Sequence, residues 1–107
     1  MPGMLSFDPI LNRYRAALGH VYGKRLERVV LYGSRARGDA APDSDYDVAV
    51  FLKDLPNRWD ELDRLVEVGI DILFDTGAVI NALPFQAKEY SNRTPLMHEI
   101  RRDGVDV

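Results

Sequence analysis

Residues Leu31–Val50 read LYGSRARGDAAPDSDYDVAV, and this stretch is the most informative part of the chain. It contains the end of one apolar run, a loop with glycine, serine and arginine, and the start of a second apolar run. The second run, Asp45–Leu52, predicts a β-strand because branched and aromatic residues dominate it. Side chains alternate between the faces of a strand, so Asp45 and Asp47 are expected on one face, with Cα atoms about 6–7 Å apart.

Two ionised carboxylates held side by side repel each other, and a divalent cation removes that cost. Mg²⁺ prefers such hard oxygen ligands, completed by water and phosphate oxygens. The run Ile70–Phe74, IDILF, predicts another strand in which Asp71 faces away from the apolar row. If the strands are neighbours, the three carboxylates could hold two cations for phosphoryl or nucleotidyl transfer. Asp75 is the alternative third carboxylate, and all these acids could instead be turn residues that cap local amides.

The loop before the second run has features of a phosphate site. Gly33 and Ser34 come where the first strand ends, and glycine lets a phosphate approach main-chain N–H groups closely. A helix that begins at Ser34 would add free amides and a hydroxyl. Arg35 and Arg37 add positive charge, so all four residues are candidates for nucleotide binding, although a strand-ending glycine is more often only a turn.

Gly33-Ser34, followed after ten residues by Asp45-x-Asp47, resembles the signature of the polymerase-β-like nucleotidyltransferase superfamily. The chain is similar to the minimal nucleotidyltransferase (MNT) group from VVLYGSRARGDAAPDSDYDVAVFL through GIDILF, and more loosely over PLMHEIRRDGVDV. The resemblance implies that Gly33 and Ser34 bind the β- and γ-phosphates of a nucleoside triphosphate. It implies two Mg²⁺ ions on Asp45 and Asp47, with Asp71 completing the second ion site and helping to activate the attacking hydroxyl.

The resemblance also implies an activity, the Mg²⁺-dependent transfer of AMP from ATP to a hydroxyl. Chains of this size resemble the antitoxin of a two-gene module whose other product is a HEPN-domain ribonuclease toxin. The family implies that the antitoxin binds this toxin and adenylylates one of its tyrosines. Two alternatives remain open: a binding module that neutralises its partner by occlusion, and a small-molecule nucleotidyltransferase such as one acting on aminoglycosides.

Composition sets the limits for these functions. A length of 107 residues suits a single minimal domain, 1–107, and 46% hydrophobic with 29% charged residues is typical of a globular chain. The net charge of −3 argues against a protein that holds nucleic acid through its backbone alone. With no cysteine, no signal-peptide pattern and no apolar run long enough for a bilayer, we expect a cytoplasmic protein.

Helices and strands alternate along the chain, which predicts an α/β or α+β fold with a small sheet flanked by helices. The resemblance makes this a mixed sheet of the polymerase-β-like type. We expect the second helix to open at Pro56-Asn57, to end at Gly69, and to bury Trp59, Leu62, Leu65 and Val66. The other expected elements are a helix from Asp8-Pro9 to Gly23 with Val21 on its inner face, strands Arg28–Tyr32 and Val79–Leu83 (the latter stopped by Pro84), and a helix from Thr94-Pro95 to Arg102.

Overall fold

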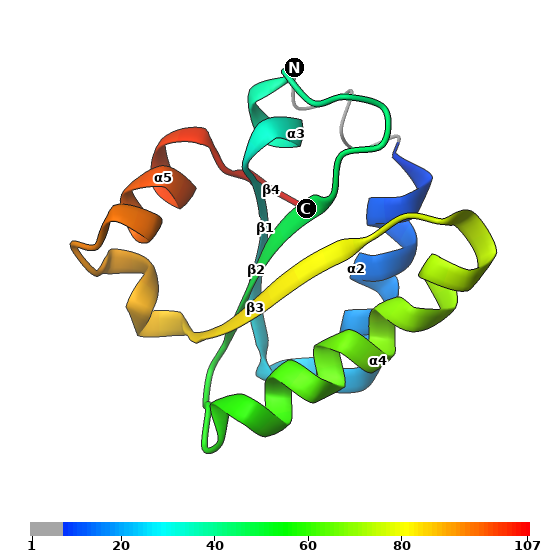
Figure 1. Ribbon diagram of the computed structural model, residues 1–107. Helices are drawn as coiled ribbons and strands as arrows, with labels where there is room; N and C mark the ends of the chain where they lie inside the picture. The colour runs from blue at the N-terminus through cyan, green and yellow to red at the C-terminus, as the bar shows by residue number, and fades with distance from the viewer. Residues whose placement is uncertain (1–7) are drawn as a thin grey trace.

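The computed structural model describes residues 8–107 as a four-stranded mixed sheet with helices on both faces (Figure 1). The strand order is β3-β2-β1-β4, in which β2 and β3 are parallel and the other pairs are antiparallel. This arrangement confirms the predicted α+β class. The elements are α2 (Pro9–Tyr22), η1 (Gly23–Arg25), β1 (Leu26–Tyr32), α3 (Ser34–Arg37), β2 (Tyr46–Leu52), α4 (Arg58–Thr76), β3 (Ile80–Gln86), η2 (Ala87–Ser91), α5 (Pro95–Asp103) and β4 (Val105–Asp106).

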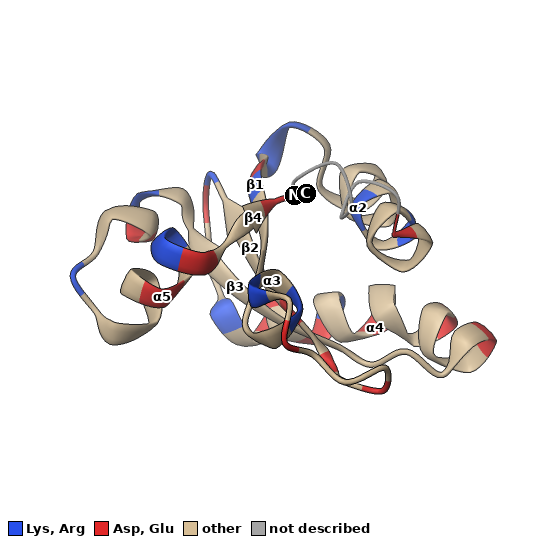
Figure 2. Cartoon of the chain, turned by 90° about the horizontal axis from the view of Figure 1, so that it is seen from above, with Lys and Arg blue, Asp and Glu red and all other residues tan. Residues whose placement is uncertain are grey.

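Strand β2 lies inside the sheet and divides the core into two parts. One face of β2 packs with α2 and α4, and the other packs with α5 and with β3's Phe85. Figure 2 shows the same division, with α2 and α4 on one side of the strands and α5 on the other. The side chains of β2 alternate as expected: Tyr46, Val48, Val50 and Leu52 lie on the α2–α4 face, and Ala49 and Phe51 on the α5 face.

Helix α4 is longer than predicted, because it continues through Gly69 to Thr76. The prediction of a strand at Ile70–Phe74 is therefore wrong. Within this run only Ile72 is buried, and it follows Leu65 by seven residues, the spacing of one helix face. The helix ends instead at Gly77, whose φ of 77° allows its N–H to donate to the Leu73 carbonyl at 2.8 Å.

The buried face of α4 also differs from the prediction. Leu65 is buried and Leu62 is half-buried, whereas Trp59 and Val66 are exposed. The helix turns Glu61 inward instead, and this side chain is only 4% exposed. Arg25 and Arg64 supply the ion pairs that make this burial possible, and the hydroxyl of Tyr22 donates to Glu61 Oε1 at 3.3 Å.

Strand β3 begins at Ile80, one residue after the predicted start at Val79, and does not stop at Pro84. Pro84 pairs in register with Val50 of β2, and among residues 8–107 no strand pairs with the other side of β3. A missing N–H is tolerated at such an edge because no further strand needs the donor. The short strand β4, at the opposite edge of the sheet, was not predicted.

The predicted starts of α2 and α5 are confirmed, and α5 ends at Asp103, one residue beyond the predicted Arg102. Asp8 Oδ1 accepts hydrogen bonds from the N–H groups of Ile10 and Leu11 at 2.9 and 3.2 Å, and Thr94 Oγ1 accepts from Met97 N–H at 3.2 Å. Val21, expected on the inner face of α2, is exposed. Between residues 8 and 107, the helices lack the length and apolar character needed to cross a bilayer.

Candidate functional site

The two aspartates lie where β2 begins. Asp45 directly precedes the strand and is exposed, and Asp47 is its second residue and half-buried. Asp47 stands opposite Tyr32 on β1 and opposite Asn81 on β3. Burial raises the pKa of Asp47, and the negative charge of Asp45 raises this pKa further. The two carboxylates are therefore close enough to repel each other.

Gly33 brings the loop against the Asp47 carboxylate. It follows β1, with φ 77° and ψ −156°, and a Cβ built at this position would overlap Asp47 Oδ2. Helix α3 starts at the next residue, and the N–H of Arg37 donates to the Gly33 carbonyl at 3.0 Å. The first N–H groups of such a turn have no partner within the helix, so they can receive an anion beside the carboxylates. Glycine is required here both by its φ angle and by this close approach.

The third position of the site is an amide. Asn81 on β3 donates from Nδ2 to Asp45 Oδ2 at 2.9 Å, and its hydrogen bonding lowers the pKa of Asp47 against the larger effect of burial. The strand that neighbours the aspartates therefore presents Asn81 and not a carboxylate. No local pattern in the sequence indicates Asn81, because only the pairing of β3 with β2 brings it to the aspartates.

Asp71, predicted as the third carboxylate, lies elsewhere. It is an exposed residue of α4, and α4 packs on the Tyr46 face of the sheet, opposite the face that carries the aspartates. The alternative, Asp75, is also on α4 and pairs with Arg13 at 2.8 Å. The expected alignment of Asp71 with Asp47 requires adjacent strands, and Ile70–Phe74 belongs to helix α4.

The two loop arginines separate. Arg35 donates from Nε and Nη2 to the Ser44 carbonyl at 2.9 and 2.7 Å, and its guanidinium lies 4.0 Å from the Tyr46 ring centre. Arg35 therefore holds the loop on the Tyr46 side of β2, and its role in nucleotide binding stays a prediction. Arg37 stays with the aspartates, since its positive charge lowers the pKa of Asp47.

Glu99 of α5 is a second residue that sequence reasoning missed. Its Oε1 lies 3.9 Å from Arg37 Nη1, and its negative charge contributes to the raised pKa of Asp47. It has the same effect on Tyr32, where burial is the main cause of a pKa of about 12. No local pattern indicates Glu99, because only the packing of α5 on the sheet brings it near β2.

The donor set can be compared with the needs of a metal ion. Among residues 8–107, no three Asp, Glu, His or Cys side chains are grouped in a way that could hold a cation. Asp45, Asp47 and the amide oxygen of Asn81 are nevertheless hard ligands of the kind that one Mg²⁺ accepts, with water or phosphate completing its shell. A second cation would need a further anionic ligand.

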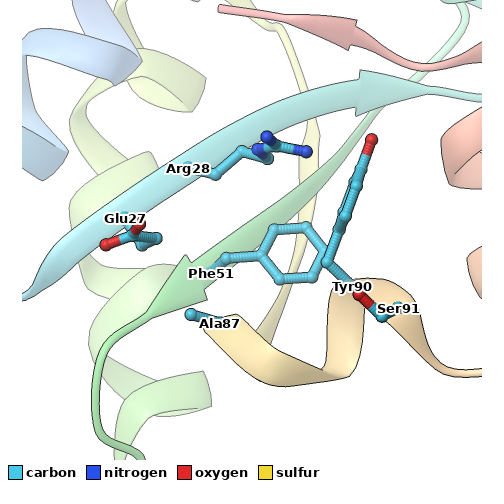
Figure 3. Close-up of a pocket in the computed structure, with 6 residues that line it drawn as sticks. All are labelled: Glu27, Arg28, Phe51, Ala87, Tyr90 and Ser91. Carbon is cyan, nitrogen blue, oxygen red and sulfur yellow. The ribbon is translucent and has the colours of Figure 1, made fainter.

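A separate hollow on the α5 face lies at the far end of β1 and β2 (Figure 3). It has a volume of about 180 Å³ and is lined by Arg28, Phe51 and Tyr90 among others. The Arg28 guanidinium lies 4.0 Å from the Tyr90 ring centre, and the Phe51 ring meets Tyr90 edge-on with centroids 5.4 Å apart. These side chains already satisfy one another, so we assign the hollow to core packing.

Comparison with known proteins gives a consistent family. Residues 21–107 match the family described as "Polymerase beta, Nucleotidyltransferase". MJ0141 of Methanocaldococcus jannaschii, by name a candidate protein adenylyltransferase, is 24% identical over 98 residues, which cover 92% of this chain and 95% of MJ0141. MJ0604 of the same organism, with the same designation, is 31% identical over 86 residues, 80% of this chain and 79% of that protein.

Solved structures share the fold at low sequence identity. A toxin–antitoxin crystallised with AMP-PNP gives a TM-score of 0.62 at 20% identity, covering 89% of this chain and 69% of that chain. A candidate nucleotidyltransferase from Sulfolobus solfataricus gives 0.63 at 21% identity, covering 99% of this chain and 86% of the other.

Proposed function

The chain belongs to the polymerase beta nucleotidyltransferase family, and on that premise we propose that it transfers AMP from ATP to a hydroxyl group of a protein. The observation that carries this proposal is the pair Asp45 and Asp47 at the start of β2, with Gly33 packed against Asp47. The relatives named as candidate protein adenylyltransferases support AMP and a protein acceptor. The shared fold of a toxin–antitoxin that was crystallised with AMP-PNP is consistent with this choice.

Each residue of the site has a proposed role. Asp45 and Asp47 hold one Mg²⁺, and the N–H groups at Gly33 and Ser34 bind the β- and γ-phosphates. Arg37 adds positive charge on the same side. The cation supplies charge neutralisation for the phosphates, and the protein contributes mainly by positioning the reactants.

In the transfer, the acceptor oxygen forms a bond to the α-phosphorus while the bond to pyrophosphate breaks. The acceptor hydroxyl loses a proton, and a carboxylate at the third position would be suited to receive it. Asn81 is neutral and cannot take the proton. We therefore propose that the proton leaves to one of the two aspartates or to water, and that transfer by this site is slow.

The proposed acceptor is a tyrosine of a HEPN-domain toxin that the chain neutralises as an antitoxin. The toxin–antitoxin neighbours support a toxin partner, and the net charge of −3 favours a protein partner over a nucleic acid backbone. A reaction that consumes ATP and modifies such a toxin is expected in the cytoplasm.

The test is incubation with α-labelled ATP, Mg²⁺ and the HEPN-domain protein proposed as the acceptor. We expect the wild type to label the toxin and Asp45→Ala/Asp47→Ala to lose at least a hundredfold in labelling. Asp43→Ala is the matched control, because Asp43 is an exposed loop acid outside the site. Equal labelling by the wild type and the double variant would remove the catalytic role of the two aspartates.

A second candidate function is neutralisation by binding alone, and Asn81 is the observation that favours it. With two carboxylates and an amide, the site could bind a nucleotide without transferring it. In that case the double variant would still protect cells from the toxin, and the toxin would carry no AMP. Turnover of a small hydroxyl compound by the isolated chain would instead favour a small-molecule nucleotidyltransferase.

A further inference from the structure

The outer side of α4 exposes a continuous apolar stripe. Its members follow the spacing of one helix face, with intervals of seven, four, three and one residues, and this face lies opposite the buried Leu65 and Ile72. A single exposed apolar residue needs no explanation, but five on one side of one helix do. The stripe consists of Trp59, Val66, Ile70, Leu73 and Phe74, which are 74%, 58%, 39%, 37% and 79% exposed.

A row of acidic residues runs beside the stripe. Its members are spaced by three, four and four residues, so they also share one side of α4. All four are exposed, and within the described chain none of them forms an ion pair. The acidic segments along α4 can be followed in Figure 2. The row consists of Asp60, Asp63, Glu67 and Asp71.

We propose that the α4 stripe is a docking surface for a protein partner that presents an apolar ridge flanked by Lys or Arg. Burial of the stripe supplies the hydrophobic contribution, and the unpaired acidic row selects a basic rim. A second copy of this chain is the weaker fit, because two α4 helices face to face would bring like charges together. Identifying the partner with the toxin rests on the proposed function.

The stripe lies away from the aspartates. Helix α4 covers the sheet face that carries Tyr46 and Val48, whereas Asp47 lies on the opposite face. A partner held on the outer side of α4 therefore leaves the aspartates open to ATP and to an acceptor. Binding and nucleotidyl transfer should then be separable by substitution.

The experiment measures, by calorimetry, the Kd for the HEPN-domain protein of the proposed function, with the purified wild type and three purified variants. We expect Val66→Glu/Phe74→Glu to raise the Kd at least tenfold. Asp63→Lys/Glu67→Lys should also raise it, and should reduce its dependence on salt. Val21→Glu on α2, also at an exposed apolar position, is the matched control and should bind as the wild type does.

Three other outcomes would contradict the docking proposal, the choice of partner or the transfer activity. An unchanged Kd for both double variants, or a wild type that does not bind the toxin, would exclude the stripe as the toxin surface. Sedimentation of the chain alone, showing a dimer that Val66→Glu/Phe74→Glu dissociates, would assign the stripe to a second copy. Stripe-dependent binding without any labelling of the toxin would retain this surface and contradict the proposed transfer activity.

Discussion

At the scale of single residues, Gly33 controls the position of the Asp47 carboxylate. Gly33→Ala adds a Cβ that overlaps Asp47 Oδ2 and forces a side chain into a positive φ. We expect the variant to lose nucleotide binding and about 2 kcal/mol or more of stability, measured by fluorescence titration and urea unfolding. Gly38→Ala has a similar φ of 87° but no atom within 4 Å of its Cβ, so it should lose only about 1 kcal/mol and still bind nucleotide.

The pKa of Asp47 is raised first by burial and then by the charge of Asp45, so ionisation of this carboxylate lowers the stability of the folded chain. Between the ordinary pKa and the raised one, the folded chain binds more protons than the unfolded chain, so stability falls as pH rises through that window. In buffer without divalent cations, Asp47→Asn should therefore be more stable than the wild type at pH 7. This gain in stability should disappear when the pH falls below the ordinary carboxyl pKa of about 4.

Thermal unfolding at several pH values measures this difference, with Asp43→Asn as the control that should show no gain. A variant that is less stable than the wild type at pH 7 would mean that Asp47 contributes to folding through contacts that outweigh its burial.

Asn81 predicts the effect of restoring a third carboxylate. Asn81→Asp places a third negative charge beside Asp45 and Asp47, so in EDTA it should lower the free energy of unfolding by about 0.5–1 kcal/mol. Mg²⁺ should reverse this loss, and titration with Mn²⁺ should show additional bound cation relative to the wild type. Asn81→Ala, without the charge, should show neither the cation-dependent recovery nor the additional cation. An Asn81→Asp variant with wild-type cation binding would contradict the assigned position.

At the scale of elements, a substitution at Gly69 tests whether α4 continues through this residue. Gly69 lies inside the helix, where a Cβ would meet only Tyr14 Cε1 at 3.8 Å, an ordinary contact. Gly69→Ala should therefore stabilise the protein by about 0.5–1 kcal/mol in urea unfolding. Gly77→Ala, at the left-handed end of the same helix, should destabilise it by about 1 kcal/mol. If Gly69→Ala is instead destabilising, the helix does not continue through this position.

The elements that the sequence predicts well are those with local signals. Asp8 and Thr94 mark helix starts through their side-chain hydrogen bonds, and β2 is a run of mostly branched and aromatic residues in which Asp47 is the single charged residue. The run IDILF fails because five apolar and acidic residues fit both a strand and a helix face. The choice between them is made by Ile72, which packs into the α2–α4 core together with Leu65.

At the scale of the whole molecule, the buried Glu61 joins α2, η1 and α4. Arg25 pairs with Glu61 at 2.5 Å and with Asp54 at 2.7 Å. Arg25→Ala leaves the Glu61 carboxylate buried with fewer partners, so it should lower the free energy of unfolding by about 2–4 kcal/mol. Arg13→Ala removes the exposed pair with Asp75 and should cost less than about 1 kcal/mol. Equal losses in urea unfolding would show that burial of Glu61 does not depend on Arg25.

Only those residues of the candidate site that lie on one strand and the loop before it can be predicted from the sequence. Asp45, Asp47 and Gly33 are close in sequence, so strand parity and the loop pattern identify them. Asn81 and Glu99 approach the aspartates through the pairing of β3 with β2 and through the packing of α5, which local patterns do not encode. The exposed side of α4 cannot be predicted from local patterns for the same reason, because the packing of the core decides which helix face is buried.

The two edges of the sheet affect how readily the chain aggregates. Pro84 deprives β3 of an amide, and β4 is two residues long and contains Asp106. Neither edge is a good template for a strand from another molecule, so growth of the sheet into aggregates is disfavoured. The chain can thus expose the apolar side of α4 without also offering a sheet edge on which aggregates could grow.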